Sequence, residues 1–255
     1  MSSSTLVSSL VRASASVALG VCVLAAALIL CTPAGSAREV RLDHRITPSP
    51  SRGTVIAKVL IRSAVRAEPD GRPVWVAMGR TRLSGSPQRL MVLAPRERAG
   101  RTWLKVRLPV RPNSASGWIP LNRVELIRSR SFVDLDRSRR IIRVFSGGER
   151  VARFRVVVGA PETPTPIGLF ALYDLVAQPS ARGFIGPWAI HLTAHSNVLH
   201  RYDGGSGRIA LHGRAGASLL DPLGSARSHG CIRMTNRRIS WLTGLSLGTA
   251  ILVHP

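Results

Sequence analysis

Short apolar segments separated by turn residues are the feature of this sequence that most constrains its fold. From Thr54 onward, runs such as TVIAKVLIRSA, VWVAMG and TWLKVRLPV alternate with turn-forming stretches such as EPDGRP and RPNSASG. Short strands with frequent turns are typical of a small barrel or sandwich. Further along, two apolar runs meet across Gly147 and Gly148, which indicates a β-hairpin. We therefore expect a mainly β protein.

Helix is expected only near the C-terminus. The stretch TNRRISWLTGLSLGT predicts a short helix that Thr235 or Asn236 can cap. Ile239 and Leu242 would then face the core, and the segment AILVHP would form a last strand. The C-terminal half should therefore be β-rich with one or two short helices.

The first 37 residues have the pattern of a secretory signal. Arg12 precedes an apolar run from Val17 to Cys31, and the helix-breaking TPAGSA follows it. The run is roughly 15 residues long, shorter than the ~20 that a membrane span needs. We expect either a cleaved signal, with Gly35 and Ala37 before the cut, or an uncleaved N-terminal anchor. The polar, Pro/Ser-rich residues 38–53 indicate a linker.

The charge is strongly positive. Thirty-six Lys and Arg against 13 Asp and Glu give +23 at neutral pH. Such a charge favours anionic surroundings. Because export argues against nucleic acid as a partner, anionic cell-wall polymers or the membrane surface are the partners that the charge suggests. A base composition that favours Arg codons would explain the charge equally well.

Cys231 becomes the sole cysteine of the mature chain if cleavage follows Ala37, because Cys22 and Cys31 lie in the exported segment. A free thiol outside the cytoplasm is either buried and inert or used as a nucleophile. Its neighbours favour the second reading. Ser228, His229 and Gly230 precede it, and a glycine in a tight turn lets successive N–H groups point at one spot.

Two histidines are candidates to accept the thiol proton. His229 is two residues before Cys231, and His212 lies in the upstream segment LHG. A zinc site made by both histidines and the cysteine is the less favoured alternative, because the spacing is unusual for zinc. Of the other histidines, only His195 lies in a section whose glycine-rich loops suggest a cleft.

At these residues the chain resembles the L,D-transpeptidase catalytic domain family of bacterial cell-wall enzymes. The carrying motif is His212, a spacer, and then SHGCIRMTN, with TPTPIGLF (Thr163 to Phe170) as a second similar stretch. The resemblance covers roughly residues 129–255. Residues 54–128 more weakly resemble a bacterial Src-homology-type small barrel, through their pair of Trp-containing strands. The implied fold is a β-rich catalytic domain preceded by a small β-barrel-like domain.

The resemblance implies a mechanism without metal or cofactor. Cys231 is the nucleophile and His212 the general base. The backbone around Ser228, His229 and Gly230 forms the oxyanion hole and its supporting turn. Arg233, Asn236 and His195 are implied or suggested substrate-binding residues.

The implied reaction is a 3→3 crosslink between peptidoglycan stem peptides through a thioester, with loss of the terminal D-alanine. The spacing of residues supports only the pairing of cysteine with histidine. An L,D-carboxypeptidase, a protein-to-wall tethering enzyme and a non-enzymatic wall-binding protein stay open as alternatives. The sequence does not define the oligomeric state.

Overall fold

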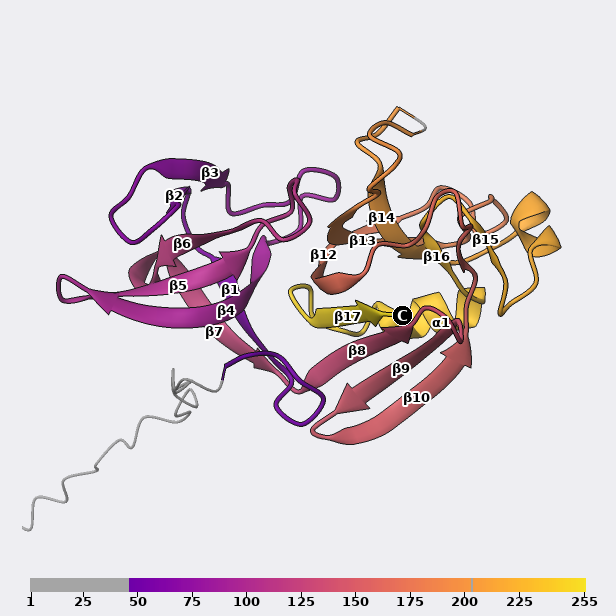
Figure 1. Cartoon of the computed structure of the whole chain (residues 1–255), viewed down its shortest axis with the longest axis horizontal. Helices are drawn as coiled ribbons and strands as arrows, with labels where there is room; N and C mark the ends of the chain where they lie inside the picture. Colours follow the sequence, from indigo (N-terminus) through magenta and orange to yellow (C-terminus); the bar gives the residue numbers. More distant parts are fainter. Residues whose placement is uncertain (1–45, 203) are drawn as a thin grey trace, which may run out of the picture. The chain divides into compact units, whose positions relative to one another are not determined.

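The computed structural model describes residues 46–202 and 204–255, and they form two large β-sheets (Figure 1). The predicted signal or anchor and residues 38–45 of the predicted linker lie outside the described residues. The mainly β class is confirmed. Within residues 46–202 and 204–255, no helix has the length and apolar character needed to cross a membrane.

The first sheet, drawn in indigo to magenta in Figure 1, has seven strands in the order β3-β2-β6-β5-β4-β1-β7. Its central strands pair antiparallel, as short connections between successive strands favour. Leu104 and Ile119 lie in its core. The strands are β1 (Thr54–Val59), β2 (Ser63–Arg66), β3 (Pro73–Ala77), β4 (Arg89–Arg98), β5 (Arg101–Arg107), β6 (Ser116–Pro120) and β7 (Val124–Ser129), with a 3₁₀ turn, η1 (Leu121–Arg123), before β7.

The second sheet has eight strands in the order β10-β9-β8-β17-β12-β13-β14-β16. Two of its pairings are parallel, β17 with β8 and β14 with β16. The strands are β8 (Ser131–Asp136), β9 (Ile141–Ser146), β10 (Glu149–Arg155), β12 (Gly168–Ala177), β13 (Trp188–His195), β14 (Arg208–His212), β16 (Ile232–Arg233) and β17 (Ala250–His254). A separate parallel pair joins β11 (Val158–Gly159) to β15 (Ala226–Ser228), and η2 (Gly216–Leu220) is a second 3₁₀ turn.

A hairpin turn and a helix lie where the sequence predicts them, because neighbouring residues determine both. Gly147 and Gly148, with φ of 61° and 97°, connect β9 to β10, and both occupy the left-handed region that glycine tolerates. Helix α1 (Asn236–Leu242) begins after Thr235, whose side chain accepts a hydrogen bond from the Arg238 amide. Ile239 and Leu242 are fully buried, as predicted. Among the described residues α1 is the one α-helix.

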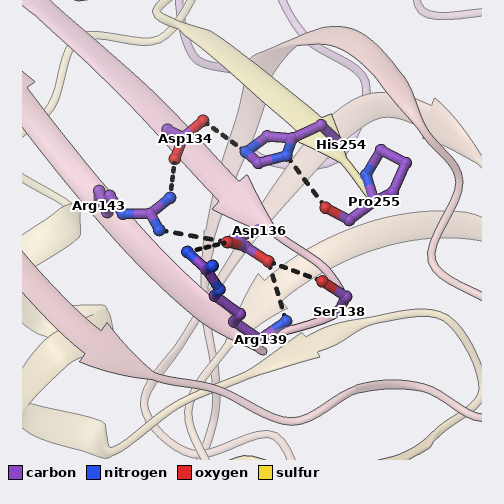
Figure 2. Close-up of polar contacts among 7 residues, drawn as sticks. All are labelled: Asp134, Asp136, Ser138, Arg139, Arg143, His254 and Pro255. Carbon is purple, nitrogen blue, oxygen red and sulfur yellow. Dashed lines mark hydrogen bonds and ion pairs between the residues drawn. The ribbon is translucent and has the colours of Figure 1, made fainter.

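A polar cluster fastens the C-terminal strand to β8 and β9, as Figure 2 shows. Arg143 donates to Asp134 at 2.7 Å and to Asp136 at 3.2 Å, and His254 Nε2 lies 3.0 Å from the other oxygen of Asp134. Burial opposes ionisation of Asp136, but hydrogen bonds from the Arg139 amide, Arg143 and Ser138 outweigh it and lower the pKa of Asp136. The cluster therefore favours the ionised form of Asp136 at the edge of the core.

The two sheets lie in one compact unit and share buried side chains. Met91 from β4 packs in one cluster with Phe132, Ala171 and Ala250 of the second sheet. Tyr173 of β12 packs into the core of the first sheet.

The domain boundary predicted near residue 129 stays a prediction, although β7 ends at Ser129 and β8 begins at Ser131. At the other boundary, Ile46 of the predicted linker is buried in the first sheet's core.

Candidate active site

Cys231 ends a tight turn between β15 and β16. Gly230 has a φ of +112°, and a Cβ there would come within 2.9 Å of Ile209 Cδ1, so the turn needs glycine. The buried hydroxyl of Ser228 spans the turn: it accepts from the Gly230 amide at 3.1 Å and donates to the Cys231 carbonyl at 2.5 Å. Ser228 therefore fixes the backbone that presents the thiol.

Two threonines hold the same turn from outside. Thr165 Oγ1 donates to the Gly230 carbonyl at 2.8 Å and accepts from the Gly159 amide at 2.9 Å. Thr163 Oγ1 donates to the Ser228 carbonyl at 3.2 Å. In the sequence analysis this stretch, TPTPIGLF, was only a second similarity to the L,D-transpeptidase family, and neither threonine was given a role.

Strand register brings His212 to the same face as Cys231. In the parallel pair β14–β16, His212 lies opposite Arg233, and paired residues share a face of the sheet. Cys231 is two residues before Arg233, so its side chain points to that face as well. The preceding pair in the register, Leu211 and Ile232, points to the other face, and both residues are fully buried. Sheet pairing thus brings side chains 19 residues apart in sequence to one face of the sheet.

The common face opens into a cavity of about 1050 Å³. Cys231, His212, His229 and Arg233 all line it. His191 of β13 also lines the cavity, although it was not a candidate site residue in the sequence analysis. The first sheet supplies another part of the wall: Trp75, Val76, Met78, Arg80, Arg82 and Leu83.

The surroundings of His212 fix which ring nitrogen is free. Its Nδ1 lies 2.7 Å from the Gly213 carbonyl oxygen, which can only accept, so Nδ1 carries the proton. Nε2 is then an unprotonated acceptor. Burial lowers the pKa of His212 to about 4, and the Gly213 carbonyl only partly opposes this effect. The ring is therefore a neutral base across the neutral pH range.

Burial acts on the thiol in the opposite sense. It raises the pKa of Cys231, while the Ala210 amide and the charge of Arg233 work against the increase. Both directions favour the neutral thiol and the neutral imidazole, a pair in which His212 would accept the thiol proton during attack.

Fewer backbone amides are available as oxyanion-hole donors than the sequence analysis suggested. The Gly230 amide is bonded to Ser228 Oγ. Within the part of the chain that the structure describes, the amides of His229 and Cys231 have no hydrogen-bond partner. These two N–H groups are the candidates to receive a developing oxyanion.

His229 itself lies against a neighbouring loop. Its ring stacks on Tyr202 with centroids 5.0 Å apart, and its Nδ1 lies 3.3 Å from the Tyr202 hydroxyl. Both side chains line the cavity. His229 therefore forms part of the wall around the thiol.

Arg233 is held by a partner that the sequence did not indicate. Its Nη1 donates to Asp221 at 2.6 Å, and its guanidinium lies 4.7 Å above the Phe184 ring. Its buried Nε has no hydrogen-bond partner among the described residues. Arg233 thus lines the cavity while Nη1 of its guanidinium is bonded to Asp221.

The other two suggested substrate residues lie elsewhere. Asn236 is not part of the cavity wall; its Oδ1 accepts from the Arg214 amide at 2.8 Å, so it holds the segment after His212. His195 is also outside the cavity wall. Its backbone bonds with Asn113, and burial followed by the charge of Arg208 lowers its pKa to about 4.

Residues 46–202 and 204–255 contain no group of three or more His, Cys, Asp or Glu side chains placed to hold a metal ion.

The second sheet thus carries, at its β14–β16 edge, a cavity with a cysteine and a histidine in its wall. Residues 129–253 match the model of the YkuD family, the L,D-transpeptidase catalytic domain. This part of the chain is therefore an L,D-transpeptidase catalytic domain. Among curated protein sequences, none matches the chain.

Solved structures similar to the chain, all at low identity, include two L,D-transpeptidases and a protein named Bd1075. An L,D-transpeptidase from Mycobacterium tuberculosis H37Rv has 15% identity over 78% of this chain and 98% of that one, with a TM-score of 0.43. Bd1075 from Bdellovibrio bacteriovorus has 23% identity over 49% and 48%, with a TM-score of 0.39. The catalytic domain of the E. faecium L,D-transpeptidase has 20% identity over 49% and 96%, with a TM-score of 0.35. The matched part thus spans about half the length of Bd1075. Likenesses this distant do not bear on individual site residues.

Proposed function

We propose that this chain is an exported, cysteine-dependent L,D-transpeptidase that forms 3→3 crosslinks in peptidoglycan. The observation that carries the proposal is the β14–β16 register, which sets Cys231 and His212 on one face at one cavity. The family match of residues 129–253 supports the substrate class, the stem peptides of peptidoglycan.

In the first half-reaction, Cys231 Sγ attacks the carbonyl of the third residue of a tetrapeptide stem. His212 Nε2 takes the thiol proton, and the carbonyl oxygen becomes an oxyanion facing the amides of His229 and Cys231. When the intermediate collapses, the C–N bond to the terminal D-alanine breaks. His212 returns the proton to the leaving amine, and a thioester on Cys231 is left.

In the second half-reaction, the side-chain amine of a diamino residue on another stem attacks the thioester carbonyl. His212 accepts a proton from this amine and returns it to the departing sulfur. The new amide is the crosslink, and the free thiol is restored. Thiol, imidazole and backbone amides supply every group that these steps use, so no cofactor is invoked.

Incubation of the purified protein with disaccharide-tetrapeptide, followed by mass spectrometry, tests the proposal. A crosslinked dimer together with free D-alanine is expected, and the Cys231→Ala variant should form neither. Tripeptide without dimer would assign the chain as a carboxypeptidase instead, and transfer to a protein amine would assign it as a tethering enzyme. Wall binding that survives Cys231→Ala in an unreactive protein would favour a binding protein.

Export to the cell wall or the outer face of the membrane belongs to the same proposal. It rests on the apolar run Val17–Cys31 and the small residues Gly35 and Ala37. The charge of +23 would favour contact with anionic wall polymers or the membrane surface. Sequencing the N-terminus of the mature protein tests this part: cleavage after Ala37 supports the signal, and an intact N-terminus in the membrane fraction supports the anchor.

A further inference from the structure

The loop between β13 and β14 forms part of the cavity wall next to the thiol. Leu199 and Tyr202 line the cavity, and Tyr202 stacks on His229, two residues before Cys231. The position of this loop, described here as residues 196–202 and 204–207, therefore affects the shape of the site.

The first sheet holds both ends of that loop through Arg111. This residue lies between β5 and β6, in the turn 109–113. Its guanidinium donates to the carbonyls of Ser196 at 2.6 Å, Leu199 at 3.2 Å and Ser206 at 3.1 Å. Ser196 and Leu199 belong to the outgoing limb and Ser206 to the returning limb. One side chain thus joins the two limbs to each other and to the first sheet.

Asn113 adds a second attachment at the end of β13. Its side-chain amide exchanges two hydrogen bonds with the backbone of His195, both 2.8 Å long, and donates to Asn197 Oδ1 at 2.9 Å. In the reverse direction, Arg208 of β14 donates to the Pro109 carbonyl at 2.9 Å. The turn 109–113 therefore contacts the strand on each side of the loop.

Few other bonds fix the loop within the described chain. Its limbs meet where the Ser196 amide donates to the Gly207 carbonyl at 2.8 Å. Gly207 has a φ of +66°, and a Cβ there would lie 1.9 Å from the Leu199 carbonyl oxygen. The remaining side-chain contact toward the second sheet is Tyr202 with His229. Arg111 and Asn113 thus supply most of the polar attachments at its base.

We propose that Arg111 and Asn113 are positioning residues for the active site: the N-terminal sheet sets the β13–β14 loop, and through it the cavity wall beside Cys231. The inference rests on the proposed function for its substrate, the stem peptide. Neither residue is among those lining the cavity, so they act through the loop that they hold.

The test compares the Arg111→Met and Asn113→Ala variants of the full chain with wild type. Arg111→Met keeps an unbranched apolar stem and removes all three hydrogen bonds to the loop. The matched control is Arg101→Met, since Arg101 is exposed on β5 and has no side-chain bond within the described residues. Arg111→Lys keeps the charge with one compact donor group and should restore part of the effect.

Three readouts separate positioning from general damage. KM for the stem peptide should rise about tenfold in Arg111→Met, equivalent to ~1.4 kcal/mol, with a smaller change in kcat. The rate at which a small thiol reagent modifies Cys231 should stay within about twofold, because the thiol turn is untouched. Backbone amides in residues 195–208 should exchange hydrogen faster, while those of β12 keep their protection.

An Arg111→Met protein with wild-type KM and wild-type exchange in residues 195–208 would overturn the inference. If that variant fails to fold, Asn113→Ala decides by the same two readouts. If wild type itself forms no crosslink, the proposed function fails. The exchange measurement would then still decide whether the turn positions the loop, and the thiol rate would show that the turn at Cys231 is intact.

Discussion

At the scale of single residues, the chemistry of the candidate site depends on how burial changes the pKa values of Cys231 and His212. Burial raises the pKa of the thiol and lowers that of the imidazole to about 4. Both changes favour the neutral forms. In the proposed mechanism the thiolate would therefore form during attack, when His212 Nε2 removes the thiol proton.

This protonation state predicts the pH dependence of acylation. His212 must be neutral to accept a proton, and its lowered pKa keeps it neutral until the pH falls to about 4. The rate of Cys231 acylation by the tetrapeptide stem should therefore vary little between neutral pH and about 5, and fall tenfold per pH unit below about 4. Rates measured by intact-protein mass spectrometry would contradict this if they halved near the ordinary histidine pKa of about 6.5.

Thr165 gives a second prediction at this scale. Thr165→Val keeps the shape and removes both the bond to the Gly230 carbonyl and the acceptor of the Gly159 amide. Because the turn would lose an anchor, we expect acylation of Cys231 to slow by about tenfold, with a loss of roughly 1–3 kcal/mol in stability. Thr243→Val, whose exposed hydroxyl bonds within helix α1, is the control and should change neither.

At the scale of elements, the sequence predicted the turns and helix ends that neighbouring residues determine. The Gly147–Gly148 hairpin and the capped helix after Thr235 lie where expected, because turns and caps depend on neighbouring residues. The parallel pairing of β14 with β16 has no local signature. The sequence therefore placed His212 near Cys231 by family resemblance, not by derivation.

Long-range contacts explain what the sequence missed. Asp221 pairs with Arg233 across 12 residues, Thr165 reaches Gly230 across 65, and Arg111 reaches Ser196 across 85. No spacing rule connects such positions. His195 was suggested because it lies in a section with glycine-rich loops, and Asn236 because it follows the motif. In the structure the His195 backbone bonds with the Asn113 side chain, Asn236 Oδ1 accepts from the Arg214 amide, and neither residue lines the cavity.

The cluster around Asp134 and Asp136 predicts which arginine stabilises the second sheet. Arg143→Met would leave two largely buried carboxylates without their main partner, so the free energy of unfolding should fall by roughly 3 kcal/mol. Arg139→Met removes a contact of 3.8 Å from a side chain that is 72% exposed, and should cost less than about 1 kcal/mol. Urea denaturation of both variants checks this, and equal losses would contradict it.

At the scale of the whole molecule, the first sheet and its loops form part of the wall of the candidate active site. Asp174 of β12 accepts hydrogen bonds from the Thr81 hydroxyl at 2.9 Å, the Ser84 hydroxyl at 2.5 Å and the Leu83 amide at 3.1 Å. These bonds fix a loop of the first sheet whose Arg82 and Leu83 line the cavity. Together with the turn at Arg111, they make two separate attachments between the sheets.

This arrangement predicts cooperative unfolding. Since Met91 and Tyr173 are each buried in clusters that combine both sheets, neither sheet keeps its full core alone. In denaturant, hydrogen exchange should report one transition for peptides from β5 and from β13. A second transition, with β13 protected after β5 has opened, would show that the sheets fold independently.

The most direct test of the central claim is the detection of the acyl-enzyme itself. Wild-type protein mixed with tetrapeptide stem and no acceptor amine should gain the mass of the stem without its D-alanine, and peptide mapping should place this mass on Cys231. His212→Gln should slow its formation at least a hundredfold, within the usual contribution of a general base. Acylation at another residue, or crosslinking by Cys231→Ala, would contradict the account.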